Sequence, residues 1–278
     1  MIPFLDLGAA YSELATEIDR AVARVLKSGW FIGGEEVAAF EDKFARYVEA
    51  KHCIGVANGL DSLILSLRAC GIAPGDEIIV PSNTFVATWL AASAVSAIPI
   101  PVEPNAATHN IEASLIEKAI TDRTRAILPV HLYGQPVDLD PILEIARKYN
   151  LRVIEDAAQA HGARYKGQRI GAHADAVCWS FYPAKNLGAM GDGGAVTTDN
   201  PDLAERLRIL GHYGSSRKYI HDAKGMNSRL DPIQAAVLEV KLAHLDLWND
   251  RRRRIASQYT ESLAGTDLIL PKVPEWAD

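Results

Sequence analysis

The chain alternates short apolar runs, rich in Val and Ile, with amphipathic stretches of helical period. Most of the runs are continuous rather than alternating, which is typical of strands covered on both faces. Strands separated by helices predict an α/β fold, with a mainly parallel sheet between layers of helices. The predicted strands are residues 77–81, 98–102, 126–130, 152–155, 176–180 and 194–198.

Helix starts are marked between these runs by an acid or amide followed by proline, a pair that places a capping side chain before the first helical position. Gln234 lies three residues after one of these acids and completes a pattern resembling a capping box. The pairs predict helices that begin at residues 141, 201 and 232, after Asp140, Asn200 and Asp231.

The composition excludes several classes of protein. With 29 Lys and Arg against 35 Asp and Glu, the net charge is −6, which is unfavourable for nucleic-acid binding. Three scattered cysteines form no CxxC pair, so they favour a reducing compartment and no metal site. No signal peptide is visible, and the apolar run 89–102 is shorter than the ~20 residues of a membrane span. These features predict a cytoplasmic protein with no nucleic-acid or membrane partner.

Two groups of residues follow predicted strands, where open α/β sheets bind their ligands. Gly59 and Leu60 begin a helix whose free amides and positive dipole end suit a phosphate; a plain Asn-Gly turn is the alternative. Glu155 and Asp156 close a buried strand, and the period of two puts one carboxylate on each face. A buried acid needs a cation or a donor, although capping of the next element is the alternative.

Lys185 lies between a strand end and a glycine-rich turn, among aromatic residues. A desolvated lysine has a lowered pKa and attacks carbonyl groups, whereas the alternative is a solvated surface lysine. The glycines after it lead into a strand, so they form no dinucleotide motif. Lys185, Asp156, the helix start at Gly59 and the aromatic Phe85 are together the groups that pyridoxal 5'-phosphate requires.

At these residues the chain resembles the DegT/DnrJ/EryC1/StrS family of pyridoxal-phosphate-dependent nucleotide-sugar aminotransferases. The resemblance follows the family's order over nearly the whole chain. It implies an aspartate-aminotransferase-like fold of type I. Residues 1–245 would form the cofactor-binding large domain with an N-terminal helical segment, and 246–278 would begin an incomplete small C-terminal domain. The matching segments are PFLDL (3–7), SGWFIGG (28–34), ANGLDSL (57–63), PSNTFVAT (81–88), PVHLYGQP (129–136), EDAAQAHGA (155–163), SFYPAKNLGAMGDGGA (180–195) and GMNSRLDPIQAA (225–236).

The resemblance implies roles for residues around the cofactor ring. Lys185 would form the Schiff base with the cofactor and then carry protons. Asp156 would pair with the pyridine nitrogen. Phe85 would stack on one face of the ring, and Gln159 would lie on the other. His131 and His161 belong to family motifs, and a structural role is favoured for both.

The resemblance also implies a phosphate site and a second subunit. The backbone of Gly59 and Leu60, with the Ser180 hydroxyl, would hold the phosphate. Asn227 would reach that phosphate from a neighbouring subunit, which makes the active site part of a homodimer. Arg229 would help to bind an anionic substrate.

Two further features concern the substrate entrance and the family pattern. Trp30 would line the entrance for the nucleotide sugar, with core packing as the alternative. Tyr182 stands where members commonly have histidine, although tyrosine also occurs there. Members continue beyond the position of Asp278 with a small domain that helps to close the active site, so the chain is a fragment or is cut short.

The implied reaction moves an amino group from an amino acid, glutamate being usual in the family, to a keto group on a nucleotide-linked deoxysugar. The motifs favour a dTDP-linked 3-keto-6-deoxyhexose, in the biosynthesis of amino sugars for surface polysaccharide or a glycosylated natural product. A 4-keto-sugar aminotransferase and a truncated, non-catalytic member are the alternatives. A related sugar dehydratase carries histidine in place of the Schiff-base lysine, and Lys185 argues against it.

Overall fold

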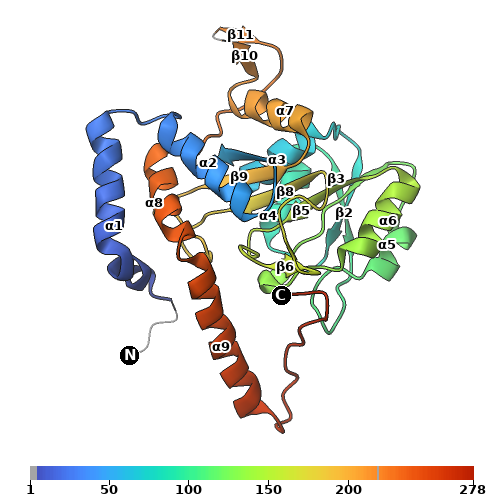
Figure 1. Ribbon diagram of the computed structural model, residues 1–278. Helices are drawn as coiled ribbons and strands as arrows, with labels where there is room; N and C mark the ends of the chain where they lie inside the picture. The colour runs from blue at the N-terminus through green and yellow to red at the C-terminus, as the bar shows by residue number, and fades with distance from the viewer. Residues whose placement is uncertain (1–4, 218) are drawn as a thin grey trace.

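The computed structural model describes residues 5–217 and 219–278, so Pro3 and Phe4 of the first motif lie outside the described residues. Its centre is a seven-stranded sheet with the order β1-β9-β8-β5-β4-β2-β3 (Figure 1). Six strands are parallel to one another, and β9 is antiparallel to both of its neighbours. The strands are β1 (His52–Val56), β2 (Glu77–Pro81), β3 (Ile98–Val102), β4 (Thr124–Ile127), β5 (Arg152–Asp156), β8 (Ala176–Ser180) and β9 (Gly194–Thr198).

The predicted mainly parallel sheet is confirmed, and four of its strands have the predicted bounds. The strand predicted at 126–130 was placed too late, because β4 begins at Thr124 and residues 128–130 continue only as isolated backbone pairing with neighbouring strands. Strand β1 was not predicted. Its sequence contains a histidine and a glycine, which weaken the apolar signal of a buried strand.

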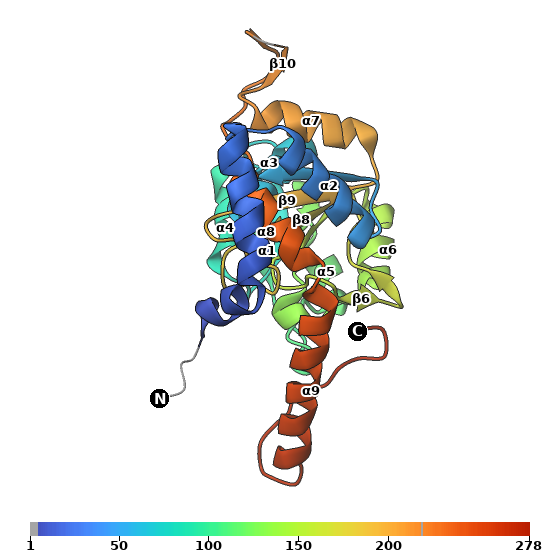
Figure 2. The same cartoon turned by 60° about the vertical axis from the view of Figure 1, so that its left-hand side comes forward.

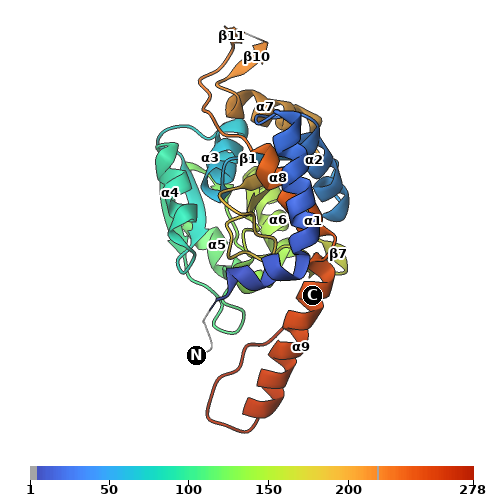
Figure 3. The ribbon, with the colours of Figure 1, turned by 90° about the vertical axis from the view of Figure 1, so that its left-hand side faces the viewer.

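Helices cover both faces of the sheet, and strand residues alternate between the two resulting cores. Ile79, Ile127 and Val153 face one core, whereas Ile78, Ala126 and Ile154 face the other. The first core is closed by α2 (Glu35–Tyr47), α5 (Ala113–Ala119), α6 (Leu139–Tyr149) and α8 (Pro232–Leu242). The second is closed by α3 (Gly59–Ala69), α4 (Val86–Ala94) and α7 (Pro201–Gly211). Figure 3 shows α4 on one side of the sheet and α2 and α8 on the other.

The remaining helices lie outside these layers. Helix α1 (Leu7–Ser28) packs on α8 through a stripe that includes Ile18 and Val25. Helix α9 (Leu245–Leu263) extends away from the sheet, as Figure 2 shows, and residues 250–262 of it are exposed. The chain then returns, and Ala277 pairs with Tyr165. The proposed division into two domains at residue 245 stays a prediction.

Short elements complete the chain. They are a 3₁₀ turn (Leu132–Gly134), the hairpin of β6 (Arg164–Tyr165) and β7 (Gln168–Arg169), and the hairpin of β10 (Ser215–Arg217) and β11 (Ile220–His221). Within the described ranges, no helix combines the length and the apolar character that crossing a bilayer requires.

One of the three predicted helix caps is confirmed, and the other two are corrected. The side chain of Asn200 accepts from the amides of Asp202 and Leu203 and caps α7 as predicted. Helix α6 begins at Leu139 rather than at 141. The proline at 141 is tolerated inside the first turn because the amides there have no helical acceptor in any case. Helix α8 begins at Pro232, but the Asp231 side chain makes no capping hydrogen bond.

Candidate active site

The parallel strands bring the predicted groups to one edge of the sheet. Strand β1 leads into the start of α3, and β2 leads to Phe85 at the start of α4. Strands β5 and β8 are neighbours, with Asp156 at the end of one and Ser180 at the end of the other. Lys185 follows Ser180 in the loop toward β9. This is the carboxyl edge, where open α/β sheets bind ligands.

Asp156 is a buried carboxylate held by two local donors. Its Oδ2 accepts from the Thr88 hydroxyl at 3.0 Å, and its Oδ1 accepts from the Ala158 amide at 3.1 Å. The second bond is the capping contact considered as an alternative, although it closes a turn rather than a helix. Burial raises the pKa of Asp156, and the two donors, the Lys185 ammonium and His131 partly oppose that rise. A cation placed against this carboxylate would stabilise its ionised form.

The other carboxylate of the pair lies apart from this centre. Glu155 is fully buried, and its Oε2 is 2.9 Å from Nε2 of His131. The amide of Val137 donates to Nδ1 of the same ring at 3.1 Å, so Nε2 carries the proton and donates to Glu155. These contacts give His131 a structural place in the fold, in agreement with its predicted role.

Lys185 is half-buried in the loop between β8 and β9. Burial lowers the pKa of its ammonium, while the negative charge of Asp156 opposes that change. Its main-chain amide donates to the carbonyl of Tyr182 at 2.8 Å, which turns the loop back on itself. The neutral amine, which is the nucleophilic form, is therefore favoured relative to a solvated lysine.

Donors for an anion gather at the start of α3. Asn58 Oδ1 accepts from the amide of Asp61 at 2.8 Å, so this cap does not use the amides of Gly59 and Leu60. A Cβ added to Gly59 would lie 2.6 Å from Cβ and 3.0 Å from Oγ of Ser180. The Ser180 hydroxyl therefore lies directly against the positive end of the helix. Two amides and one hydroxyl form a donor set that fits a phosphate group.

The two residues predicted to lie on the faces of the cofactor ring differ in their exposure and contacts. The Phe85 side chain is 70% exposed, so the rest of this chain leaves it uncovered. Gln159 is half-buried, and its Oε1 accepts from the amide of Tyr133 at 2.7 Å. This contact fixes the orientation of the Gln159 amide and points its oxygen toward Tyr133.

The predicted substrate residues lie at the periphery. Trp30 is 63% exposed, and its indole N–H donates to the carbonyl of Ile32 at 2.8 Å. The alternative of core packing is therefore wrong for Trp30. The ring folds over its own loop, which is possible because Gly34 has no side chain: an added Cβ would lie 2.7 Å from the indole. Asn227 is exposed, and its backbone pairs with His212. Arg229 is half-buried, with its guanidinium 5.8 Å from the centre of the Tyr213 ring.

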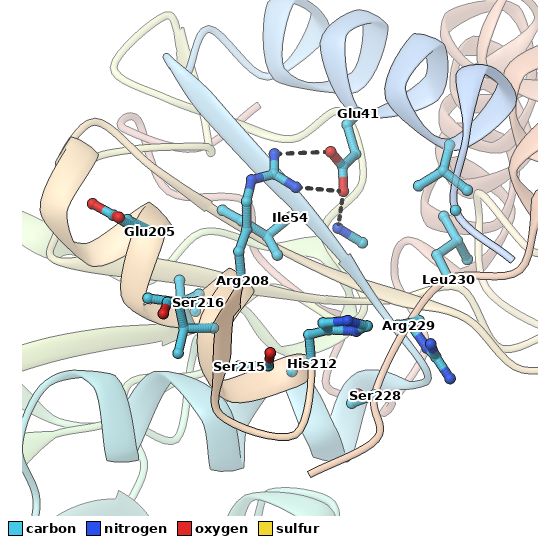
Figure 4. Close-up of a pocket in the computed structure, with 16 residues that line it drawn as sticks. Glu41, Ile54, Glu205, Arg208, His212, Ser215, Ser216, Ser228, Arg229 and Leu230 are labelled. Atoms are coloured by element: carbon cyan, nitrogen blue, oxygen red, sulfur yellow. Dashed lines mark hydrogen bonds and ion pairs between the residues drawn. The ribbon is translucent and has the colours of Figure 1, made fainter. Parts of the chain in front are cut away.

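A cavity of about 430 Å³ lies between β1, α7 and the segment that carries Arg229. Figure 4 shows residues that line it. Arg208 Nη2 donates to Glu41 Oε2 at 2.9 Å, and Glu41 Oε1 accepts from the Gly55 amide at 2.7 Å. Neither Lys185 nor Asp156 lines this cavity. The Arg208–Glu41 ion pair and the bond of Glu41 to Gly55 hold α2, β1 and α7 together.

A second cavity, of about 870 Å³, lies between α9 and the loop after β5. Gln159, His161 and Asn186 line it, so it adjoins both the Asp156 segment and the residue next to Lys185. His161 is buried against the rings of Trp179 and Phe181, and burial lowers the pKa of its imidazole to about 3. A neutral ring packed against two aromatic rings is consistent with the structural role favoured for it.

Thr88 has a place at the site that the sequence analysis did not assign. It is fully buried and donates to Asp156 from the first turn of α4. The signal in the sequence was a single hydroxyl in an otherwise apolar helix start, three residues after Phe85.

Comparisons with known proteins identify the family of the chain. The model of the DegT/DnrJ/EryC1/StrS aminotransferase family matches residues 12–278. The dTDP-3-amino-3,4,6-trideoxy-alpha-D-glucose transaminase of Streptomyces venezuelae is 58% identical over 264 residues, 95% of this chain and 70% of the relative. The dTDP-3-amino-3,6-dideoxy-alpha-D-galactopyranose transaminase of Aneurinibacillus thermoaerophilus is 56% identical over 275 residues, 99% of this chain and 76% of the relative.

A solved structure matches the same extent of chain. The crystal structure of DesV from S. venezuelae, in complex with a ketimine intermediate, has a TM-score of 0.98 and 56% identity, covering 100% of this chain and 75% of that one. The sequence matches and the solved structure therefore agree on the fold and the family. The chain belongs to the DegT/DnrJ/EryC1/StrS aminotransferase family, whose enzymes depend on pyridoxal 5'-phosphate.

Proposed function

We propose that the chain transfers an amino group from glutamate to the 3-keto group of a dTDP-linked 6-deoxyhexose, in amino-sugar biosynthesis. The observation that carries the reaction type is the half-buried Lys185 beside the buried Asp156 at the carboxyl edge of the sheet. The substrate class is supported by two relatives, at 58% and 56% identity, that are both named as transaminases of dTDP-3-amino sugars.

Pyridoxal phosphate, when bound, supplies an electron-withdrawing ring that stabilises negative charge at the α-carbon of the donor. Asp156 would hold the ring nitrogen in its protonated form. Lys185 would bind the aldehyde carbon and, once released from it, take up and return the proton of the donor α-carbon. The lowered pKa of the Lys185 amine suits it to accept a proton.

The remaining predicted residues would hold the cofactor. The amides of Gly59 and Leu60, with the Ser180 hydroxyl, would bind the phosphate, since all three lie at the start of α3. Phe85 and Gln159 would lie on opposite faces of the ring.

The substitution Gly59→Ala should weaken cofactor binding. The new Cβ would lie 2.6 Å from Cβ of Ser180, so either the hydroxyl or the helix start must move away from the phosphate position. We expect the dissociation constant for pyridoxal phosphate to rise about tenfold or more, the loss of about one charge-assisted hydrogen bond. Absorbance titration of the apoprotein measures it. Gly71→Ala, at the opposite end of α3, is the control for general destabilisation, because its φ of +84° strains alanine while no atom lies within 4 Å of the added Cβ. Equal affinity for both variants would contradict the assignment.

A second copy of the chain would complete the active site. Asn227 is exposed and belongs to the motif expected to reach a neighbouring subunit. Large apolar side chains are also exposed near the predicted substrate entrance, among them Trp30, Phe31 and Ile32, and burial against a second chain would remove them from water. We infer a homodimer in which Trp30 and Arg229 line the substrate entrance.

Mass spectrometry of the products decides the substrate. Purified protein supplied with pyridoxal phosphate and glutamate is offered a panel of dTDP- and UDP-linked 3-keto and 4-keto sugars. We expect amination of the dTDP-linked 3-keto-6-deoxyhexose at a kcat/KM at least about tenfold above every other panel member, a difference of about 1.4 kcal/mol. A preference for a 4-keto sugar would assign the alternative substrate class, and no product from any member would favour a non-catalytic role. The cytoplasmic location and the surface-polysaccharide or natural-product pathway stay predictions.

A further inference from the structure

The loop that carries Lys185 has little regular structure of its own. Residues 181–193 join β8 to β9 without a helix or strand, closed by the bonds of Lys185 to Tyr182 and of Ala189 to Phe181. Gly188 lies so close to the start of the loop that an added Cβ would be 2.3 Å from the carbonyl oxygen of Pro183. The position of the Lys185 amine therefore depends on what holds this loop from outside.

Asn249 of α9 holds one side of the loop. Its Oδ1 accepts from Nδ2 of Asn186, the residue next to Lys185, at 3.0 Å. Its Nδ2 donates to the carbonyl of His161, in the segment that follows Asp156, at 2.8 Å. Asn249 is 8% exposed, so one buried amide joins the two segments that carry the proposed catalytic groups.

The backbone beside Asn249 leaves room for this contact. Gly162 has a φ of +89°, and an added Cβ would lie 2.6 Å from Asn249 Nδ2. A side chain at position 162 would therefore displace the amide from its bond to His161. The contact needs both the asparagine and the glycine that faces it.

Lys241 of α8 holds the other side of the loop. Its Nζ donates to the carbonyl of Gly188 at 2.7 Å, although the residue is only 7% exposed. Burial lowers the pKa of its ammonium, and no neighbouring carboxylate among residues 5–217 and 219–278 opposes that change. An unpaired buried ammonium is costly, and an apolar side chain of similar length would fill the space at lower cost. At position 241, lysine differs from an apolar residue of similar length by its hydrogen bond to the carbonyl of Gly188.

We propose that Asn249 and Lys241 form a polar brace that fixes Lys185 relative to Asp156, and that both are positioning residues for amino transfer. The proposal rests on the proposed function. Condensation and proton transfer require the amine within a fraction of an ångström of its reacting partner, and a displacement of 1 Å can cost about 100-fold in rate. The brace also links the start of α9 to the lysine loop, so the C-terminal part of the chain contributes to the geometry of the site.

The experiment replaces each brace residue by an apolar one of similar size, as Asn249→Leu and Lys241→Met. For both holoproteins we expect kcat to fall about 10- to 100-fold, with the KM for glutamate changed less than about twofold. The apoprotein melting temperature of Lys241→Met should equal or exceed that of the wild type, because an unpaired buried charge is removed. Borohydride reduction followed by peptide mass spectrometry should still find the cofactor on Lys185, at a lower rate of labelling.

A matched control and a double variant separate positioning from general destabilisation. Lys43→Met removes a surface lysine of α2 that pairs with Glu239 of α8, the helix that also carries Lys241. This variant should keep the wild-type kcat. Asn186→Ala combined with Asn249→Ala should lower kcat no more than Asn249→Ala alone, because Asn249→Ala already removes the bond to Asn186 as well as the bond to His161. Additive effects would count against the brace.

Two outcomes overturn the proposal separately from the proposed function. If Lys185 is labelled in the wild type and both apolar variants keep the wild-type kcat, the brace is wrong and the proposed function stands. The brace is also wrong if the loss of kcat matches the loss of folded protein. If the wild type is not labelled at Lys185, the proposed function fails and the brace fails with it.

Discussion

Replacing Lys185 by alanine should abolish amino transfer, with kcat falling by more than about 10³-fold. The substitution removes the Lys185 amine, which we propose binds the cofactor covalently and moves the proton of the donor. Burial lowers the pKa of the Lys185 amine, although the negative charge of Asp156 opposes that change, so the nucleophilic form is favoured relative to a solvated lysine. Single-turnover absorbance after addition of glutamate measures the loss, together with borohydride labelling of residue 185.

The control for Lys185→Ala is Lys43→Met, which removes a surface lysine of α2 and leaves Lys185 in place. We expect labelling at residue 185 to persist in this control and to vanish in Lys185→Ala. Turnover near the wild-type level in Lys185→Ala would show that another group performs the covalent and proton-transfer steps.

The same variant tests the shared active site. If Asn227 acts on the neighbouring subunit, a mixed dimer of Lys185→Ala and Asn227→Asp chains contains one site with both an intact lysine and an intact asparagine. Refolding the two inactive chains together should therefore restore part of the activity. Activity that stays at the sum of the two separate variants would place Asn227 in the site of its own chain.

The substitution Asp156→Asn should lower kcat by about 10²- to 10⁴-fold while leaving the fold intact. An amide is neutral, so it cannot stabilise a protonated ring nitrogen as a carboxylate does. Asparagine can keep the local contacts: its oxygen can accept from Ala158, and its NH₂ can donate to Thr88, whose hydroxyl also lies 2.9 Å from that of Thr84. The rate of proton removal from deuterated and ordinary glutamate measures the effect.

Asp156→Asn should lower the activity but raise the stability of the apoprotein. Burial raises the pKa of Asp156, so folding disfavours its ionised form. The resulting penalty is absent when the carboxyl is protonated in both folded and unfolded chains, and it grows as the pH rises from the unfolded pKa through the folded pKa. We therefore expect apo Asp156→Asn to gain melting temperature relative to the wild type as the pH rises through that window. A gain on acidification instead, or near-normal activity of Asp156→Asn, would contradict this account of the buried carboxylate.

Much of the sheet could be predicted from local patterns, whereas most of the candidate site residues came from the resemblance to the family. Continuous apolar runs marked strands such as 77–81 and 176–180, since a run of this kind is buried on both faces in any parallel sheet. Local signals failed where the decisive contact was distant. The capping-box pattern at Asp231 predicted a bond within the first turn of α8, but Gln234 instead accepts from the amide of Met190 in the lysine loop.

The amino-acid sequence by itself determined most of the strands of the central sheet, the helix that begins with free amides, and the residue types that stand at the strand ends. These features depend on side-chain period and on neighbours along the chain, which are local properties. The tertiary structure decided that β5 lies beside β8, that Asp156 is buried, and that Asn249 joins Asn186 to His161 across 63 and 88 residues of sequence. Burial and long-range hydrogen bonds arise only when separate elements pack, and they set the pKa shifts and the fixed geometry on which the proposed chemistry depends.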